Sequence, residues 1–335
     1  QYSVQKIVYL DVREKFGLSA LLAVRSIAKV ADAYKLDKKR KRTFKPFGAI
    51  TFDDRILSWK LDTSVVSINT IGGRLKVPFV CGEKQRELLK SRQGESDLIL
   101  FRDNFFISAT CNIEEPIETE GDDVLGIDMG VVNLAVDSDG TVYSSETLNR
   151  VRANRRNQRA QLQSVGTKSA KRHLKKLSGK EKRFARNTNH VISKAIVQTA
   201  KDTNRSIAIE DLTGIRTRTR FHKAQRSTMT SWAFFQLRQF LTYKSKLAGV
   251  KLTAVDPRYT SQTCPACGCV SKANRPNQSA FKCVACGFSG LHAYHVAAIN
   301  IRRKATVNLP IVSTTGARLS LSSESPVASG TSRLL

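Results

Sequence analysis

The sequence predicts an α/β fold that also carries a small antiparallel β-barrel and a zinc ribbon. Three observations lead to this fold class. Short β-rich runs occupy residues 47–112, helices alternate with buried strands between residues 124 and 259, and four cysteines near the C-terminal end form a C-x2-C, x15, C-x2-C array. A chain of 335 residues with 41% hydrophobic content can bury cores in two or three domains.

The first 45 residues are predicted to form a helical segment followed by a basic arm. Leu21, Val24 and Ile27 follow one another with the spacing of a helix face between residues 13 and 34. The arm contains the consecutive basic residues Lys38, Lys39, Arg40, Lys41 and Arg42. Such a run is either a solvated loop or an arm that contacts phosphate groups, and the sequence leaves both interpretations open.

Residues 46–115 are predicted to form the barrel. Five or six short runs rich in β-branched and aromatic residues are separated by turns, of which 71–73 and 102–104 are typical of hairpins. The acidic stretch that follows contains Pro116 and Gly121, and this composition predicts a domain boundary between residues 114 and 123.

The α/β region begins with a predicted three-stranded meander, and Asp128 ends its first strand. Residues 147–202 are predicted to be helical in two or three pieces, because the pattern breaks near Gly166 and again at Ser178-Gly179.

A buried strand at residues 206–210 then ends at Glu210, and a helix at 231–247 leads to another strand at 251–255. Residues 305–335 are rich in Ser and Thr, which predicts a disordered tail.

The charge of the chain indicates a nucleic-acid partner. The sequence has 56 Lys and Arg against 28 Asp and Glu, a formal net charge of +28, which is typical of proteins that bind a polyanion. A membrane surface is less favoured, because no apolar run of 18 residues and no lipidation motif is present. The basic segments after residue 147 contain few acids, unlike an ordinary solvated helix face. Candidate contacts there are Arg152, Arg155, Arg156, Arg159, Lys171, Arg172, Lys175, Lys176, Arg216, Arg218 and Arg220.

The four cysteines of the array are Cys264, Cys267, Cys283 and Cys286, and they predict a structural Zn²⁺ site made of two knuckles. Two disulfides are the alternative, but they need an oxidising compartment, and nothing at the N-terminus resembles a signal peptide. A cytoplasmic, nucleoid-associated protein is therefore expected. The three other cysteines are then spare thiols with a packing role, and these are Cys81, Cys111 and Cys269.

Asp128 and Glu210 are candidate catalytic metal ligands. Each stands at the C-terminal end of a predicted strand, where an open α/β sheet places its ligands. Carboxylates that meet at such an edge can hold two Mg²⁺ ions for hydrolysis of a phosphodiester. The alternative is that each acid is a helix cap or a surface charge.

Six blocks of the sequence together resemble one family, the TnpB proteins of insertion sequences, which are RNA-guided DNA nucleases related to type V CRISPR effectors. The blocks are GIDMGVVNLAV (126–136), NTNHVISKAIV (187–197), IAIEDLTGIRTR (207–218), YTSQTCPACG (259–268), FKCVACG (281–287) and HAYHVAAINI (292–301). The resemblance covers nearly all of residues 1–304, although the family normally begins some tens of residues earlier. It implies a guide RNA and a target DNA as partners, and no membrane.

The same resemblance implies a domain order. A partial helical recognition segment is expected at 1–45, a wedge-type β-barrel at 46–115, an RNase H-like RuvC domain at 122–259 and 291–304, an inserted zinc ribbon at 260–290 and a tail at 305–335. The family's catalytic triad falls on Asp128, Glu210 and Tyr294, and the third position is an aspartate in the family.

Tyr294 therefore predicts a weakened or absent nuclease. A tyrosine is neutral at ordinary pH and cannot replace a carboxylate that binds Mg²⁺. Asp256, His292 and His295 are the nearby residues that could substitute for the missing ligand. The open alternatives are a disabled RNA-guided DNA-binding protein, which is either a decayed copy or a repressor, and an active nuclease that tolerates Tyr294.

A third interpretation comes from another class of protein. The stretch GIDMGVVN resembles the first phosphate loop of actin-like and sugar-kinase ATPases. The zinc ribbon, the net charge and the lack of a later glycine-rich loop argue against an ATPase.

Overall fold

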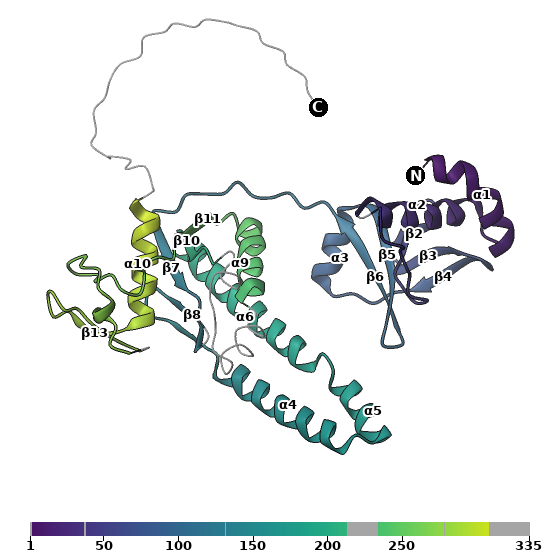
Figure 1. Ribbon diagram of the computed structural model, residues 1–335. Helices are drawn as coiled ribbons and strands as arrows, with labels where there is room; N and C mark the ends of the chain where they lie inside the picture. Colours follow the sequence, from purple (N-terminus) through teal and green to yellow (C-terminus); the bar gives the residue numbers. More distant parts are fainter. Residues whose placement is uncertain (1, 37, 131, 213–233, 278, 308–335) are drawn as a thin grey trace, which may run out of the picture. The chain divides into compact units, whose positions relative to one another are not determined.

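The computed structural model describes residues 2–36, 38–130, 132–212, 234–277 and 279–307 (Figure 1). Contacts divide the chain into two compact units, Gln1–Glu114 and Glu115–Leu335. Three of the candidate nucleic-acid contacts lie outside the described residues, namely Arg216, Arg218 and Arg220, and so does the predicted tail from residue 308 onward. None of the helices in these ranges has the length and apolar character needed to cross a membrane.

The first unit begins with two helices, α1 (Tyr2–Phe16) and α2 (Ala20–Leu36). The prediction of one helix from residue 13 was therefore wrong. Gly17 has a φ of 59°, a left-handed conformation that ends α1. The basic arm follows α2, and its four residues Lys38–Lys41 are exposed, whereas Arg42 is half-buried.

The strands of the first unit form two sheets. One contains β2 (Leu57–Lys60), β3 (Val65–Thr70) and β4 (Gly73–Pro78), and the other contains β1 (Ile50–Phe52), β5 (Arg92–Phe101) and β6 (Asn104–Cys111). Phe52, Ile56 and Val66 belong to one apolar core of this unit. The two predicted hairpins are confirmed, because β3 pairs with β4 and β5 pairs with β6 in antiparallel fashion.

The expectation of a single barrel is not met by this pairing, since no ladder joins the two sheets among the described strands. An unpredicted helix, α3 (Glu83–Lys90), lies in the chain between β4 and β5. Its sequence EKQRELLK consists of strong helix formers, which accounts for a helix in this connection.

The second unit is built on a mixed sheet with the order β11-β10-β7-β8-β9. The predicted meander is confirmed as β7 (Asp123–Asp128), β8 (Asn133–Asp137) and β9 (Val142–Ser144), which pair antiparallel. On its other side β7 pairs in parallel with β10 (Arg205–Glu210), and β10 pairs in parallel with β11 (Leu252–Val255).

Helices cover both faces of this sheet (Figure 1). Leu125 and Ile127 share a core with residues of α6 (Lys180–Asp202) and α9 (Phe234–Ala248). Val124 and Ala208 point to the opposite face and pack on α10 (Ala293–Val307). This alternation between faces is the pleat of a strand buried on both sides, as in α/β proteins.

Gly126 of β7 lies directly against the backbone of α10. A Cβ atom at this position would lie 2.2 Å from the carbonyl oxygen of Ala298 and 2.6 Å from the amide nitrogen of Arg302. Only glycine therefore allows α10 to pack this closely on the sheet.

A helical arm connects β9 to β10, and its first two helices project away from the sheet (Figure 1). Its helices are α4 (Glu146–Val165), α5 (Lys168–Leu177) and α6. The predicted breaks are confirmed, because Gly166 and Gly179 both adopt positive φ, at 65° and 76°. Thr167 caps α5 by accepting a hydrogen bond from the amide of Ala170.

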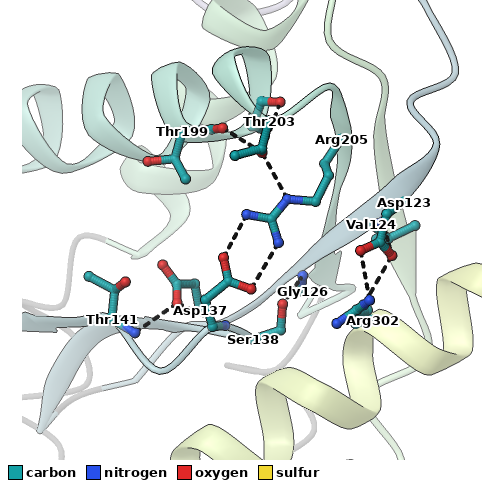
Figure 2. A network of polar contacts seen from close by, with 12 residues as sticks. Asp123, Val124, Gly126, Asp137, Ser138, Thr141, Thr199, Thr203, Arg205 and Arg302 are labelled. Carbon is teal, nitrogen blue, oxygen red and sulfur yellow. Dashed lines mark hydrogen bonds and ion pairs between the residues drawn. The ribbon is translucent and has the colours of Figure 1, made fainter.

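Two arginine–aspartate ion pairs lie at the N-terminal ends of the parallel strands β7 and β10 (Figure 2). Arg205 of β10 donates to both carboxylate oxygens of Asp139, at 2.8 and 2.6 Å. Arg302 of α10 donates to both oxygens of Asp123 on β7, at 3.1 and 2.6 Å. Bidentate pairs of this kind fix orientation as well as adding energy. The first pair connects the turn between β8 and β9 to β10, and the second pair connects α10 to β7.

The Arg205–Asp139 pair predicts an effect of pH on stability. The hydrogen bond from Arg205 lowers the pKa of Asp139, so the pair stabilises the fold above the aspartate's ordinary pKa and this contribution is lost as the pH falls. Asp139 is 41% exposed, so solvent screens the interaction. Arg205→Met should lower the free energy of unfolding by roughly 1 kcal/mol at pH 7, and the difference should begin to shrink below about pH 4 and disappear once the pH is below the lowered pKa of Asp139.

Urea denaturation at both pH values measures this difference. Arg303→Met, at an exposed arginine of α10, is the control and should show little effect at either pH. An undiminished cost of Arg205→Met at pH 3.5 would contradict the ionic explanation.

Candidate functional site

The four cysteines of the array meet at one point of the zinc ribbon. Their sulfur atoms all lie within 4.8 Å of one another. The Cys264 and Cys286 sulfurs are 3.7 Å apart, and those of Cys267 and Cys283 are 3.6 Å apart. Four thiolates at about 2.3 Å from a tetrahedral Zn²⁺ are separated by about 3.8 Å, whereas a disulfide needs about 2.05 Å. The geometry therefore fits a structural zinc and excludes the two disulfides.

Both knuckles of the ribbon have the same backbone. Gly268 donates its amide to the Cys264 carbonyl, and Gly287 donates to the Cys283 carbonyl. The two glycines have φ values of 76° and 73°, so each knuckle needs a residue that tolerates the left-handed region. The amide of Cys286 also donates to Cys283 Sγ, at 3.5 Å, which connects the two cysteines of the second knuckle.

Asp128 and Glu210 lie on neighbouring parallel strands. Ile127 of β7 is paired with Ile209 of β10, so the two acids are the next residues along both strands. Because side chains alternate along a strand, both acids point to the face that α10 covers. The sequence prediction that these acids meet at the C-terminal edge of the sheet agrees with this register.

The surroundings of the acid pair disfavour two negative charges. Burial, followed by repulsion from Glu210, raises the pKa of Asp128 to about 8. Burial also raises the pKa of Glu210, while a hydrogen bond from Thr260 acts in the opposite direction. Thr260 is buried, and its hydroxyl lies 2.5 Å from Glu210 Oε1. Clustered carboxylates with raised pKa values are common at functional sites.

Tyr294 lies on α10 beside the loop that follows Asp128. A Cβ atom at Gly130 would lie 3.8 Å from Tyr294 Cε1. The Tyr294 ring is 8% exposed and stacks on His292 with a centroid distance of 5.1 Å. The guanidinium of Arg275, which belongs to the ribbon, lies 5.5 Å from the centroid of the same ring. The Tyr294 ring and the Arg275 guanidinium therefore lie at the position where the family has a third carboxylate.

These residues do not fit a two-magnesium centre. Magnesium prefers carboxylate oxygens and water, and a two-metal site shares several acids between the ions. Within the described ranges, the four cysteines are the one group of three or more metal-ligating side chains close enough to hold an ion. Asp128 and Glu210 therefore lack a third partner there.

The three residues that could replace the missing ligand are engaged elsewhere. The carboxylate of Asp256 accepts the amide of Arg258, at 3.0 Å. His295 Nε2 lies 3.1 Å from the carbonyl oxygen of Ser138, and His292 stacks on Tyr294.

The candidate nucleic-acid contacts on the helical arm differ in exposure. Arg156, Arg159 and four residues of α5 are exposed, and those of α5 are Lys171, Arg172, Lys175 and Lys176. Arg152 and Arg155 are half-buried. Arg152 and Arg159 also share one acid, Glu181, at 4.0 and 3.2 Å. The α5 residues therefore present the most accessible positive charge of this set.

Sequence reasoning missed three residues of the site, namely Thr260, Arg275 and Asn300. Asn300 of α10 is buried and donates to the carbonyls of Thr260 and Thr263, at 2.8 and 2.7 Å. Thr260 lies four residues before Cys264 of the first knuckle, and this nearness in the sequence was the signal that could have identified it. Arg275 carried no signal in the sequence, because its partners are 19 and 147 positions away.

The zinc site predicts a specific effect of cysteine replacement. The protein as purified should contain about one zinc per chain, and Cys286→Ser should lower this stoichiometry and loosen the ribbon. Elemental analysis and limited proteolysis of the ribbon measure both effects. Cys81→Ser, at a half-buried thiol of the first unit, is the matched control and should keep its zinc. Equal zinc contents in the two variants would contradict the assignment.

Two family models match the chain. Residues 108–215 match the model of the IS605 OrfB "Probable transposase", and residues 234–301 match "Cas12f1-like, TNB domain". The first match includes Asp128 and Glu210, and the second includes the cysteine array and Tyr294.

Curated proteins are similar over parts of their length. CRISPR-associated endodeoxyribonuclease Cas12f1 of Sulfoacidibacillus thermotolerans is 38% identical over 37% of this chain and 28% of its own. TnpB-like protein MJ0751 of Methanocaldococcus jannaschii is 33% identical over 49% of this chain and 62% of its own. Putative RNA-guided DNA endonuclease InsQ of Escherichia coli is 28% identical over 48% of this chain and 44% of its own. The chain thus spans less than two thirds of each of these relatives. Together with both family models, these relatives support the TnpB family for this chain.

Proposed function

We propose that the chain is an RNA-guided DNA-binding protein in which DNA cleavage is lost or weak. Two of its relatives are named as an RNA-guided DNA endonuclease and a CRISPR-associated endodeoxyribonuclease, which supports guidance by RNA. The observation that carries the loss of cleavage is Tyr294, whose ring lies beside Gly130, two residues after Asp128, and 5.5 Å from the guanidinium of Arg275. In such a system the target DNA is recognised by base pairing with the guide RNA, and the protein binds the sugar–phosphate backbones of the RNA–DNA duplex.

In this proposal the mixed sheet and its helices are an RNase H-like RuvC domain. The ribbon lies in the chain between β11 and α10, as an insert in that domain would. The two sheets and helices of the first unit take the roles of wedge and recognition segment. Asp128, Glu210 and Tyr294 occupy the three catalytic positions.

Guide RNA and target DNA are the proposed partners of the basic surfaces. The exposed residues of α5 follow the pattern of a helix with one apolar side, since Ala170 and Leu177 are buried and Leu174 is half-buried. The opposite side carries only basic and neutral polar residues, which suits phosphate contacts. The arm at Lys38–Lys41 in the first unit is a second exposed basic segment.

An active nuclease is the second candidate. It is favoured by the preserved pair of Asp128 and Glu210 and by their raised pKa values, because catalytic acids often show such shifts. The loss of one metal ligand can nevertheless lower a rate by several powers of ten.

Cleavage by the purified RNA complex separates the two candidates. Sequencing of the copurifying RNA should first show a discrete species with one defined end. With that RNA, matching duplex DNA and Mg²⁺, the protein should bind the target specifically and cut it at least about 100-fold more slowly than an active family member. Efficient cutting at neutral pH would refute the disabled state, and random cellular RNA would refute guidance.

The basic side of α5 predicts a change in salt dependence. Replacement of all four of its residues, Lys171, Arg172, Lys175 and Lys176, by alanine should weaken binding to duplexes of any sequence. If all four contact phosphate groups, the slope of log Kd against log salt concentration should fall by about 3.6, because each lost phosphate contact removes about 0.9. Titrations between 50 and 200 mM salt measure the slope.

The double variant Lys84→Ala, Lys90→Ala is the control. Both lysines are exposed on α3, where Glu83 and Glu87 give mixed charge. This control should leave the slope nearly unchanged. If the α5 variant and the α3 control change the slope equally, α5 does not contact the nucleic acid specifically.

A further inference from the structure

We propose that the ring of Tyr259 is a stacking platform for one unpaired nucleobase of a nucleic-acid strand that passes the acid pair, Asp128 and Glu210. The proposal deepens the function proposed above, because it rests on nucleic-acid binding at this site and adds the chemical group that is bound there. The stacking platform is the exposed ring of this one residue.

Tyr259 has a backbone conformation that a tyrosine rarely adopts. Its φ is 61°, in the left-handed region that glycine tolerates and that is unfavourable for a residue with a β-carbon. In the described part of the chain five non-glycine residues have a positive φ, and Tyr259 is the one aromatic residue among them. A bulky residue keeps such a conformation only where its surroundings enforce it, and positions of this kind cluster at functional sites.

Hydrogen bonds within the turn enforce the conformation of Tyr259. Its carbonyl accepts the amides of Gln262 and Thr263, at 2.9 and 3.0 Å. The same carbonyl also accepts the hydroxyl of Thr263, at 2.8 Å. The turn is therefore closed by three bonds to one carbonyl group.

The residues on both sides of Tyr259 are also fixed. The carbonyl of Arg258, which precedes it, accepts a hydrogen bond from Lys304 of α10, at 2.5 Å. Thr260, which follows it, is buried and hydrogen-bonded to Glu210. The platform is thus carried by the residue between an anchor on α10 and an anchor on the acid pair.

The zinc ribbon supports the same turn. Asn274 is fully buried and donates its side-chain amide to the carbonyls of Gln262 and Cys269, at 2.8 and 3.0 Å. Its side-chain oxygen accepts the amide of Val284 in the second knuckle, at 2.9 Å. The turn that carries Tyr259 is therefore bonded to the ribbon through one buried side chain.

The side chain of Tyr259, in contrast to its backbone, makes no contact that would explain the strain. It is 58% exposed, and within the described ranges its phenol group has no hydrogen-bond partner and its ring no aromatic or cationic neighbour. Tyr243 of α9 is 41% exposed, but its ring packs edge-on against Phe240, with the centroids 5.9 Å apart. A rigidly held ring with an open face is suited to a ligand from outside the chain.

An unpaired nucleobase is the ligand that this position fits. Stacking needs an open ring face on a rigid support, and every base can supply the second face. The side chain of Arg258 is 79% exposed and reaches Asp256 only at 4.0 Å, so its guanidinium can contact the phosphate group of the same nucleotide. The base must be unpaired, because neighbouring bases cover both faces of a base inside a duplex.

The strain predicts opposite effects of one substitution on stability and on binding. Asparagine tolerates the left-handed region better than tyrosine, so Tyr259→Asn should raise the midpoint of urea unfolding. The same variant loses the platform and should bind single strands more weakly. A tyrosine with a packing role would give the reverse result for stability, so a lowered midpoint of Tyr259→Asn would overturn the proposal.

Photo-cross-linking of the full chain to short single strands tests the contact directly. Strands of DNA and of RNA that contain 5-iodouracil are irradiated with the protein, and mass spectrometry identifies the linked residue, because iodouracil couples to an aromatic ring stacked on it. Tyr259 should be linked, and Tyr243 is the control that should not be. Linkage to either kind of strand supports the platform and identifies the strand, whereas no linkage of Tyr259 to either would overturn it.

The affinity for the same strands gives a second measurement. Tyr259→Asn should weaken binding between about 5-fold and about 100-fold, the range for one stacked base, while Tyr259→Phe keeps the ring and should bind like the wild type. The control Tyr243→Ala should also bind like the wild type. An unchanged affinity of Tyr259→Asn would overturn the proposal, and so would an equal loss for Tyr259→Phe. These strands contain no guide, so a failure here is distinct from a failure of RNA-guided binding.

Discussion

The close packing of α10 on β7 is the constraint on which the candidate site depends. Gly126 lets the helix backbone approach the strand to a distance that any side chain would prevent. The pair of Arg302 and Asp123 holds the same helix to the start of the same strand. Because the first turn of α10 carries Tyr294, this packing decides which side chain reaches the face of the sheet with Asp128 and Glu210.

The segment between β11 and the first knuckle connects three parts of the site. Thr260 contacts Glu210 through its hydroxyl, and Asn300 of α10 holds the carbonyls of Thr260 and Thr263. The sheet, the final helix and the base of the ribbon are therefore joined by side chains that are buried and hydrogen-bonded. A displacement of one part disturbs all of these bonds, which gives the site a single preferred arrangement.

Much of the second unit could be predicted from local patterns. The helix breaks at Gly166 and Ser178-Gly179 could be predicted because glycine readily adopts the left-handed conformation that ends a helix. The spacing of the four cysteines was sufficient to predict that their sulfur atoms meet at one site. The position of Asp128 and Glu210 at the same end of the sheet could be predicted, because the C-terminal ends of parallel strands lie along one edge of a sheet.

The remainder depended on contacts that no local pattern encodes. Gly17 interrupts a pattern that otherwise continues as one helix, and α3 has helix formers within a region of strands. Pairing of the first unit's strands into two sheets depends on long-range register. Arg275 meets Tyr294 only because the ribbon folds back on α10. The sequence showed Tyr294 as a missing carboxylate, whereas the structure shows it as the partner of a cation.

The anchoring of Asn274 gives the zinc ribbon a consequence beyond its own folding. Its hydrogen bonds reach both knuckles, and each knuckle contributes thiolates to the zinc site. The residue next to it is Arg275, whose guanidinium lies 5.5 Å from the centroid of the Tyr294 ring. Zinc binding to the four thiolates would therefore also order the backbone on which Asn274 and Arg275 lie.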